Sequence, residues 1–209
     1  MTVLVIADDA MRIELGQPIA NSELQLTWAD DFSPASMNEI DVCVDLLFDN
    51  SSERIHLLKQ LSSAVVIINS VIDPLSGIDE NFIRINAWPG FLKRALVEAA
   101  GENIRAKETA EKIFALFGKK MEWVPDIPGL ISARVIVSII NEAWFANEEE
   151  VSTRNEIDIA MKLGTNYPYG PFDWCDKIGL VNVHRLLSML ASRQERYKPA
   201  ASLEKAATA

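Results

Sequence analysis

Short apolar runs alternate with amphipathic stretches over residues 1–125. The runs fall at 3–7, 24–29, 42–48, 64–69, 82–87, 95–100 and 121–124. Several of them are almost continuously apolar, which is typical of strands buried on both faces of a parallel sheet. Helical periodicity appears between the runs, at 51–63 and at 103–120, where Gly118 is placed to end the helix. This alternation predicts a mostly parallel α/β domain over 1–125.

The pattern changes after residue 125, where only helical periodicity remains. The spacing predicts a long helix at 130–146, a second at 152–164 that starts at a Ser or Thr cap, and a third at 182–197. No strand pattern follows. The sequence therefore predicts an all-helical domain over 126–209, with Leu203 in the tail docking on the helices.

A stretch rich in glycine, proline and aromatic residues, 161–180, interrupts the helical pattern. Gly164 is expected to leave its helix through a left-handed cap, and the two prolines 168 and 171 stop the helix from continuing. Gly170 suggests a backbone conformation that other residues adopt only at a cost. The stretch is interpreted as a rigid connector between helices, pinned by three aromatic anchors: Tyr167, Phe172 and Trp174.

The chain of 209 residues is 49% hydrophobic and 24% charged, which fits a folded soluble protein rather than a disordered one. Its net charge is −10, and residues 1–60 hold eleven acids against three bases, a balance of −8. Nucleic acid and anionic membranes are therefore poor partners for this part of the chain. Without a membrane-spanning run or an export signal, a cytoplasmic location is expected.

The residues that often carry chemistry are sparse. Cys43 and Cys175 are too few for a disulfide framework and are expected to be reduced thiols, with a catalytic thiol as the alternative. The two histidines, His56 and His184, lie in helical patterns and follow no metal-binding spacing. No metal is expected from these residues.

Acidic residues follow three of the predicted strands and could meet at one edge of a parallel sheet. They are Asp8 and Asp9, Asp30 and Asp31, and Asp49. A divalent metal or a cationic ligand at this edge is one interpretation, because carboxylates are hard oxygen ligands. A solvated acidic rim is the other.

Residues 126–180 resemble the 3-hydroxyacyl-CoA dehydrogenase family at many fixed spacings. The matching positions are Asp126, Pro128, Gly129, Arg134, Asn141, Glu142, Ala143, Ile157, Asp158, Ala160, Met161, Lys162, Gly164, Tyr167, Pro168, Gly170, Pro171, Phe172, Asp176, Ile178, Gly179 and Leu180. The resemblance continues upstream more weakly. It implies a Rossmann-like N-terminal domain, here shortened, and a helical C-terminal domain that dimerises and closes over a substrate cleft.

The resemblance also implies where the family's catalytic groups would fall. Members use a histidine as the proton acceptor and a glutamate that orients it, and these positions correspond to Asn86 and Glu98. A substrate-binding serine corresponds to Val71, with Ser70 adjacent, and a substrate-binding asparagine corresponds to Ala133. An amide is not a general base near neutral pH, so only Glu98 is retained.

The family binds NAD at a glycine-rich turn after the first strand. Here that turn reads ADDAMR, from Ala7 to Arg12, without glycine and with two carboxylates where the diphosphate would lie. NAD is therefore not expected as a cofactor of this chain.

Three hypotheses follow from these losses. The first is a degenerate family member that lacks hydride transfer and binds an acyl-CoA or a partner protein. The second is an active but divergent NAD-dependent 3-hydroxyacyl-CoA dehydrogenase. The third is an interaction module whose acidic residues 1–60 contact a basic partner. A homodimer is expected through the helical domain, because the helix at 130–146 is apolar on more than one stripe, including Ile136, Ile140 and Trp144.

Overall fold

The computed structural model describes residues 1–19, 24–32, 40–61, 64–76 and 78–209. The chain divides into two compact units, Met1–Leu130 and Ile131–Ala209. The sequence-based boundary lay between residues 125 and 126, so the five residues 126–130 pack with the first unit. Each unit is described by itself.

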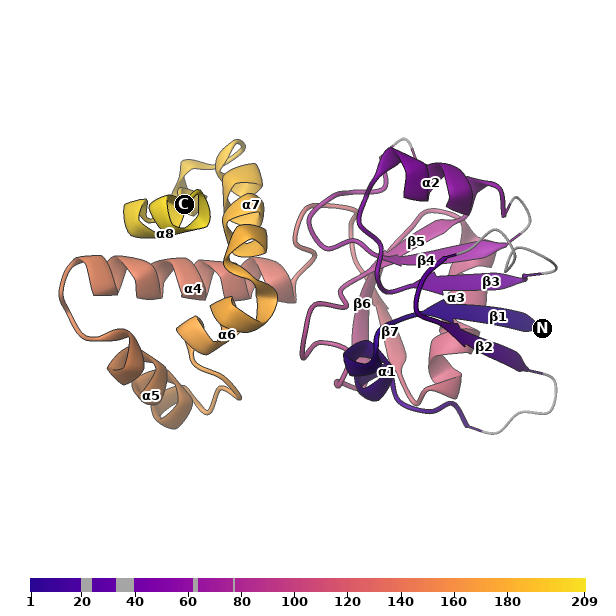
Figure 1. Cartoon of the computed structure of the whole chain (residues 1–209), viewed down its shortest axis with the longest axis horizontal. Helices are drawn as coiled ribbons and strands as arrows, with labels where there is room; N and C mark the ends of the chain where they lie inside the picture. The colour runs from indigo at the N-terminus through magenta and orange to yellow at the C-terminus, as the bar shows by residue number, and fades with distance from the viewer. Residues whose placement is uncertain (20–23, 33–39, 62–63, 77) are drawn as a thin grey trace. The chain divides into compact units, whose positions relative to one another are not determined.

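The first unit is built on one seven-stranded sheet in the order β2-β1-β3-β4-β5-β6-β7 (Figure 1). Neighbouring strands are parallel except for the antiparallel pair of β5 and β6. This confirms the predicted mostly parallel α/β fold, and each of the seven predicted strands is present. The strands are β1 (Thr2–Ile6), β2 (Gln25–Ala29), β3 (Val42–Asp45), β4 (Val65–Asn69), β5 (Phe82–Ile85), β6 (Leu96–Ala100) and β7 (Lys120–Trp123).

Both faces of the sheet are covered, which explains the continuous apolar runs. Along β1, Val3 and Val5 belong to one hydrophobic cluster, while Leu4 and Ile6 belong to the other. All four side chains are at most 3% exposed. Burying an aliphatic side chain stabilises a fold by about 1.5–3 kcal/mol, so this short strand is a large part of the core.

Three helices cover the sheet. They are α1 (Asp9–Leu15), α2 (Ser52–Lys59) and α3 (Ile104–Leu116). Side chains from α1 and α3 pack in the first cluster, and side chains from α2 pack in the second. The helix predicted at 51–63 ends at Lys59, and residues 62–63 lie outside the described part. The helix predicted at 103–120 ends at Leu116, before a left-handed Gly118 with φ 69°. Helix α1 was not predicted.

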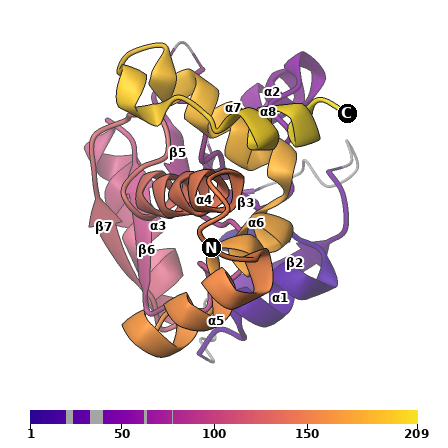
Figure 2. The same cartoon turned by 90° about the vertical axis from the view of Figure 1, so that its left-hand side faces the viewer.

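The second unit is helical throughout, and residues 126–209, all of them described, contain no strand. Figures 1 and 2 show the long helix α4 with α5 and α6 on one side and α7 and α8 on the other. The helices are α4 (Ser132–Glu148), α5 (Arg154–Thr165), α6 (Pro171–Ile178), α7 (Leu180–Ala191), the 3-10 helix η2 (Glu195–Tyr197) and α8 (Ala201–Ala207). The predicted helix at 182–197 is therefore α7 followed by a separate turn.

The C-terminal tail packs as predicted, because Leu203 in α8 is fully buried. A buried amide holds the tail in place. The Asn141 Nδ2 atom donates to the Lys198 carbonyl at 2.9 Å, and its Oδ1 atom accepts from the Ala200 amide at 2.8 Å. Asn141 is thus satisfied on both sides by backbone groups.

The connector at 161–180 differs from its prediction in three respects. Residues 171–178 of the predicted connector form a helix of their own, α6, with Pro171 in its first turn. Helix α5 continues through Gly164 and ends at Thr165, and Asn166 after it takes the left-handed conformation with φ 56°. Gly170 has an ordinary backbone with φ −71°. The prolines do mark a helix boundary, since a proline in the first turn needs no backbone donor.

The requirement for glycine at position 170 is steric. The buried carboxylate of Asp158 on α5 accepts from the amides of Phe172 at 2.8 Å and Asp173 at 3.1 Å, and so caps the start of α6. A Cβ atom on Gly170 would lie 2.3 Å from the Asp158 Cγ atom. A side chain here would displace the carboxylate that satisfies two helix-terminal donors.

This contact predicts opposite effects for two glycine substitutions. Gly170→Ala should lower the free energy of unfolding by about 1–3 kcal/mol, because the Asp158 cap must move. Gly164→Ala is the matched control, since a Cβ atom there meets nothing within 4 Å and the residue lies within α5. The control should be neutral or more stable by up to about 1 kcal/mol. Urea unfolding of both variants measures the difference, and equal effects would contradict the steric argument.

Candidate functional site

The positions that correspond to the family's histidine and glutamate meet across two strands. Asn86 follows β5, Glu98 lies in β6, and the Asn86 amide donates to the Glu98 carbonyl at 3.1 Å. Asn86 is 2% exposed and Glu98 is 9% exposed. The antiparallel pairing of β5 with β6 therefore brings together two residues that are twelve positions apart in the sequence.

The side-chain amide of Asn86 is only partly satisfied. Its Oδ1 atom accepts from the Trp88 amide at 3.3 Å, whereas its Nδ2 atom has no hydrogen-bond partner among the described residues. An unpaired buried donor costs about 1–3 kcal/mol, so such groups are rare and usually have a purpose. The carboxamide can donate a hydrogen bond, but it cannot take a proton from a hydroxyl group. The pair's assigned roles stay a prediction.

Ser70 and Val71 follow β4 and are also buried, at 6% and 3% exposure. The Ser70 hydroxyl donates to the Asp73 carbonyl at 2.8 Å, so its proton is already used within its own turn. The Val71 carbonyl accepts from the Gly129 amide at 2.8 Å. Here the two positions expected to bind substrate hold a loop in place.

The loop is shaped by Arg84, which sequence reasoning missed. Arg84 lies in β5, is fully buried, and pairs with Asp126. Its guanidinium also donates to three backbone carbonyls, those of Ser70 at 2.9 Å, Val71 at 3.2 Å and Ile127 at 2.6 Å. The signal was an arginine inside the apolar run FIRI, because a charge in a buried strand requires a partner.

Ala133, the position of the family's substrate-binding asparagine, lies in the second unit near the start of α4. It is fully buried. Its methyl group can neither donate nor accept a hydrogen bond, so this position packs the helix and cannot hold a polar substrate group.

The turn after β1 does not fit a dinucleotide. It contains no glycine, and the Asp8 carboxylate itself accepts from the Met11 amide at 2.8 Å. This cap takes one of the helix-terminal donors that a diphosphate would need. The neighbouring Asp9 side chain is 95% exposed, and α1 is only seven residues long. The residues present therefore supply repulsion where the cofactor's charge would lie.

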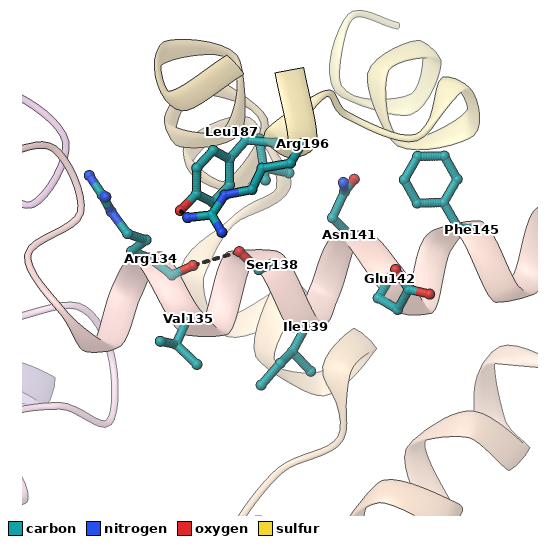
Figure 3. Close-up of a pocket in the computed structure, with 10 residues that line it drawn as sticks. Arg134, Val135, Ser138, Ile139, Asn141, Glu142, Phe145, Leu187 and Arg196 are labelled. Atoms are coloured by element: carbon teal, nitrogen blue, oxygen red, sulfur yellow. Dashed lines mark hydrogen bonds between the residues drawn. The ribbon is translucent and has the colours of Figure 1, made fainter. Parts of the chain in front are cut away.

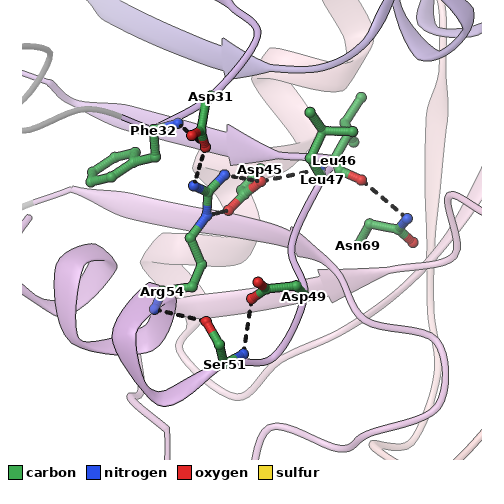
Figure 4. Close-up of polar contacts among 9 residues, drawn as sticks. All are labelled: Asp31, Phe32, Asp45, Leu46, Leu47, Asp49, Ser51, Arg54 and Asn69. Carbon is green, nitrogen blue, oxygen red and sulfur yellow. Dashed lines mark hydrogen bonds and ion pairs between the residues drawn. The ribbon is translucent and has the colours of Figure 1, made fainter.

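The acidic residues at the carboxyl ends of the strands are largely paired with arginines. Arg12 contacts Asp30 at 2.5 Å, and Arg54 contacts both Asp31 and Asp45 (Figure 4). The hydrogen bond from Arg54 holds the pKa of Asp31 below its usual value. Within the described residues, no group of three or more histidine, cysteine or acidic side chains could hold a metal ion. These carboxylates thus serve ion pairs and caps.

The two cysteines are packed as small apolar residues. Cys43 is fully buried in β3 and Cys175 is 3% exposed in α6. Burial raises the pKa of Cys175 to about 11 and raises that of Cys43 further. Both thiols are therefore protonated near neutral pH, and a protonated thiol is a poor nucleophile. This disfavours the catalytic-thiol alternative.

The sequence is similar to a known protein family and to several known proteins. Residues 129–209 match the family model for the 3-hydroxyacyl-CoA dehydrogenase C-terminal domain. The chain is 40% identical to the 3-hydroxyadipyl-CoA dehydrogenase of Escherichia coli, over 43% of this chain and 19% of that protein. It is 29% identical to a probable 3-hydroxybutyryl-CoA dehydrogenase of Deinococcus radiodurans, over 94% of this chain and 73% of that protein.

A solved structure shares the whole fold. The (S)-3-hydroxybutyryl-CoA dehydrogenase of Ralstonia eutropha superposes with a TM-score of 0.75 at 19% identity, covering 98% of this chain and 92% of that chain. At this identity the likeness shows the fold alone. The aligned segment spans 19% of the length of the E. coli protein. It spans 40% of the length of a probable 3-hydroxybutyryl-CoA dehydrogenase of Bacillus subtilis.

The sheet topology and the helical second unit define a Rossmann-like fold followed by a helical domain. Residues 129–209 carry the C-terminal domain of the 3-hydroxyacyl-CoA dehydrogenase family. In the described residues, no helix has the length and apolar character needed to cross a membrane.

The raised pKa of Cys175 predicts slow alkylation of the native protein. At pH 8 with iodoacetamide, Cys175 should remain unmodified while the chain is folded, because the thiolate is the reactive form and burial disfavours it. In urea, both cysteines should react fully, which serves as the control. Mass spectrometry measures the modification. Rapid labelling of native Cys175 would contradict the assignment and reopen the question of a reactive thiol.

Proposed function

We propose that this chain is a degenerate member of its family that does not catalyse NAD-dependent hydride transfer. Its proposed role is to bind an acyl-CoA, or a partner protein, through the region around Asn86 and Glu98. The observation that carries the proposal is the buried Asn86 Nδ2 atom, which has no hydrogen-bond partner among the described residues and to which the resemblance assigns the place of the family's catalytic base.

The chemistry of this donor supports binding rather than catalysis. A thioester or 3-oxo carbonyl oxygen on an acyl-CoA can accept a hydrogen bond from Asn86 Nδ2. Pairing the two would remove the cost of the unpaired donor, which is about 1–3 kcal/mol. Because Asn86 is 2% exposed, the ligand would have to open the surface above it.

The rest of the catalytic set supports the same proposal. The Ser70 hydroxyl is bonded to the Asp73 carbonyl, and Ala133 offers no polar group. Asp8 caps α1 where the cofactor's diphosphate would lie. The alternative is an active but divergent dehydrogenase of fatty acid metabolism, as the activities in the relatives' names suggest. It requires a proton acceptor other than Asn86.

A helical surface supports the expected homodimer, although the sequence-based reason for it was wrong. Ile136, Ile140 and Trp144 are at most 5% exposed, so the chain itself buries them. Ile131, just before α4, and Val135 within it are exposed, at 52% and 50%, and Ile139 and Phe145 on α4 are half-buried. We define the α4 surface as Arg134, Val135, Ser138, Ile139, Glu142 and Phe145, which line a hollow of about 570 Å³ (Figure 3).

The charges on the α4 surface suit a two-fold axis. Arg134 precedes Ser138 by four residues and Glu142 follows it by four. If two α4 helices pack antiparallel about Ser138, each Arg134 faces the Glu142 of the other copy. A self-complementary patch of this kind is what an isologous dimer requires. Val135 and Ile139 would then be covered at the centre.

A direct assay separates the proposed function from the active alternative. With acetoacetyl-CoA and NADH, the rate at which NADH absorbance falls should not exceed the rate without protein. The reason is that the Asn86 amide cannot give a proton to the substrate oxygen or take one from it. A rate that is present in the wild type and absent in Glu98→Gln would establish the alternative.

Binding without catalysis is tested by calorimetric titration of acetoacetyl-CoA. Asn86→Ala should weaken binding by roughly 5- to 30-fold, since one hydrogen bond contributes about 1–2 kcal/mol. The control is Asn155→Ala, an exposed amide on α5 that should leave the affinity unchanged. Equal affinities of the wild type and Asn86→Ala would remove Asn86 from the site.

The dimer proposal predicts that light scattering gives twice the 23.3 kDa of one chain. Ile139→Glu should shift the protein to the monomer, because it buries an unpaired charge at the centre of the α4 surface. Leu163→Glu is the control, since Leu163 is 84% exposed and lies outside that surface. A wild-type mass of a single chain would refute the dimer.

A further inference from the structure

Parallel sheets bind ligands where the strand order reverses, beyond the carboxyl ends of the strands. In this chain the reversal lies at β1, which has β2 on one side and β3 on the other. The chain leaves β1 for β2 through α1, and it leaves β3 for β4 through α2. The carboxyl ends of β2, β1 and β3 therefore mark the switch point at which a ligand of this fold is expected.

The side chain of Arg54 bridges the two outer strands of this switch point, β2 and β3. The Arg54 Nε and Nη2 atoms contact the Asp45 carboxylate at 2.6 and 3.0 Å, and its Nη1 atom contacts Asp31 at 2.8 Å (Figure 4). Asp45 is the last residue of β3, while Asp31 comes two residues after the end of β2. Since β1 lies between these strands, the guanidinium group extends across its carboxyl end.

The Arg54 guanidinium contacts an aromatic ring as well as the two carboxylates. Its carbon lies 5.5 Å from the centre of the Phe32 ring, which is 5% exposed. Asp45 is fully buried and the Arg54 side chain is 11% exposed. The Ser51 hydroxyl accepts from the Arg54 amide at 3.1 Å, which fixes the start of α2. A buried carboxylate, a second carboxylate and an aromatic face together make a binding site for a guanidinium ion.

The ion pair between Arg12 and Asp30 provides a comparison in the same unit. Arg12 also lies over an aromatic ring, that of Trp28, at 5.7 Å. Its partner Asp30 is 86% exposed, however, and the Arg12 side chain is 29% exposed. The chemistry of the two pairs is alike and their burial is different, so they form a matched set.

We infer that Arg54 is a tethered occupant of this switch point, and that its guanidinium fills the place where related folds bind a ligand. The carboxylates of Asp31 and Asp45 thus form a cation site that the chain satisfies internally. A dinucleotide diphosphate would have to displace the guanidinium and then face the carboxylates of Asp31 and Asp45. This inference does not depend on whether acyl-CoA binds near Asn86.

Chemical rescue tests the inference. Arg54→Ala leaves the fully buried Asp45 without its cation, so the melting temperature should fall by on the order of 10 °C. Millimolar ethylguanidinium chloride should then raise the melting temperature of Arg54→Ala by several degrees, with saturation, because the empty site is already shaped for it. The wild type should gain nothing from the same salt.

Two variants serve as controls. Arg12→Ala should lose little stability and should show no rescue, because its carboxylate is exposed. The double variant Arg54→Ala with Asp45→Asn should recover stability and lose the rescue, since no buried charge remains. It also keeps the test valid if Arg54→Ala alone fails to fold. Equal rescue of Arg54→Ala and of the double variant, or no rescue of Arg54→Ala, would overturn the inference.

A titration with NADH separates this inference from the proposed function. Calorimetry of the wild type should show no binding at millimolar NADH. Micromolar NADH affinity in a protein that keeps the Arg54 contacts would overturn the inference that Arg54 occupies the switch point. The result of the acyl-CoA titration does not affect this conclusion. Failure of acyl-CoA to bind, with rescue intact, would refute the proposed function alone.

Discussion

A guanidinium group inside a folded sheet must find both an opposite charge and hydrogen-bond acceptors, and Arg84 shapes much of the first unit by this requirement. It is fully buried in β5, where an unpaired charge would be prohibitively costly. Asp126 supplies the charge, and the carbonyls of Ser70, Val71 and Ile127 supply acceptors. The exit of β4 and the segment that leads to the second unit are therefore both fixed by one side chain of β5.

The same solution recurs at the end of β3, where Arg54 satisfies Asp45 and Asp31. At both Arg84 and Arg54, a guanidinium group of the chain binds carboxylates or carbonyls that could otherwise bind a ligand. Each carboxylate or carbonyl bound in this way is unavailable to an outside partner. The Nδ2 atom of Asn86 is the contrasting case, because it is buried and finds no hydrogen-bond partner in the part of the chain that the structure describes.

Sequence reasoning recovered the strands and the helical second half, because burial imposes periods that can be read directly. It missed α1, whose seven residues are too few to show a period. It placed Asn86 and Glu98 twelve residues apart without a contact, and only the antiparallel turn of β5 onto β6 shows them as neighbours. Arg84 and Arg54 were missed as organising residues, because a partner that is distant in sequence leaves no local signal. The apolar residues Ile136, Ile140 and Trp144 were correctly read as helical, but their burial inside the chain depends on packing that periodicity cannot show.

The stretch 161–180 shows why ancestry and activity are separate conclusions. Gly170 is required because the Asp158 carboxylate of α5, which caps α6, lies where a Cβ atom of residue 170 would be. That constraint acts on the fold of the second unit and persists whether or not a reaction is catalysed elsewhere. The positions that the resemblance assigns to the reaction, Asn86, Ser70, Val71 and Ala133, all lie outside this stretch. Contacts that identify an ancestry can therefore persist independently of the chemistry at a reaction site.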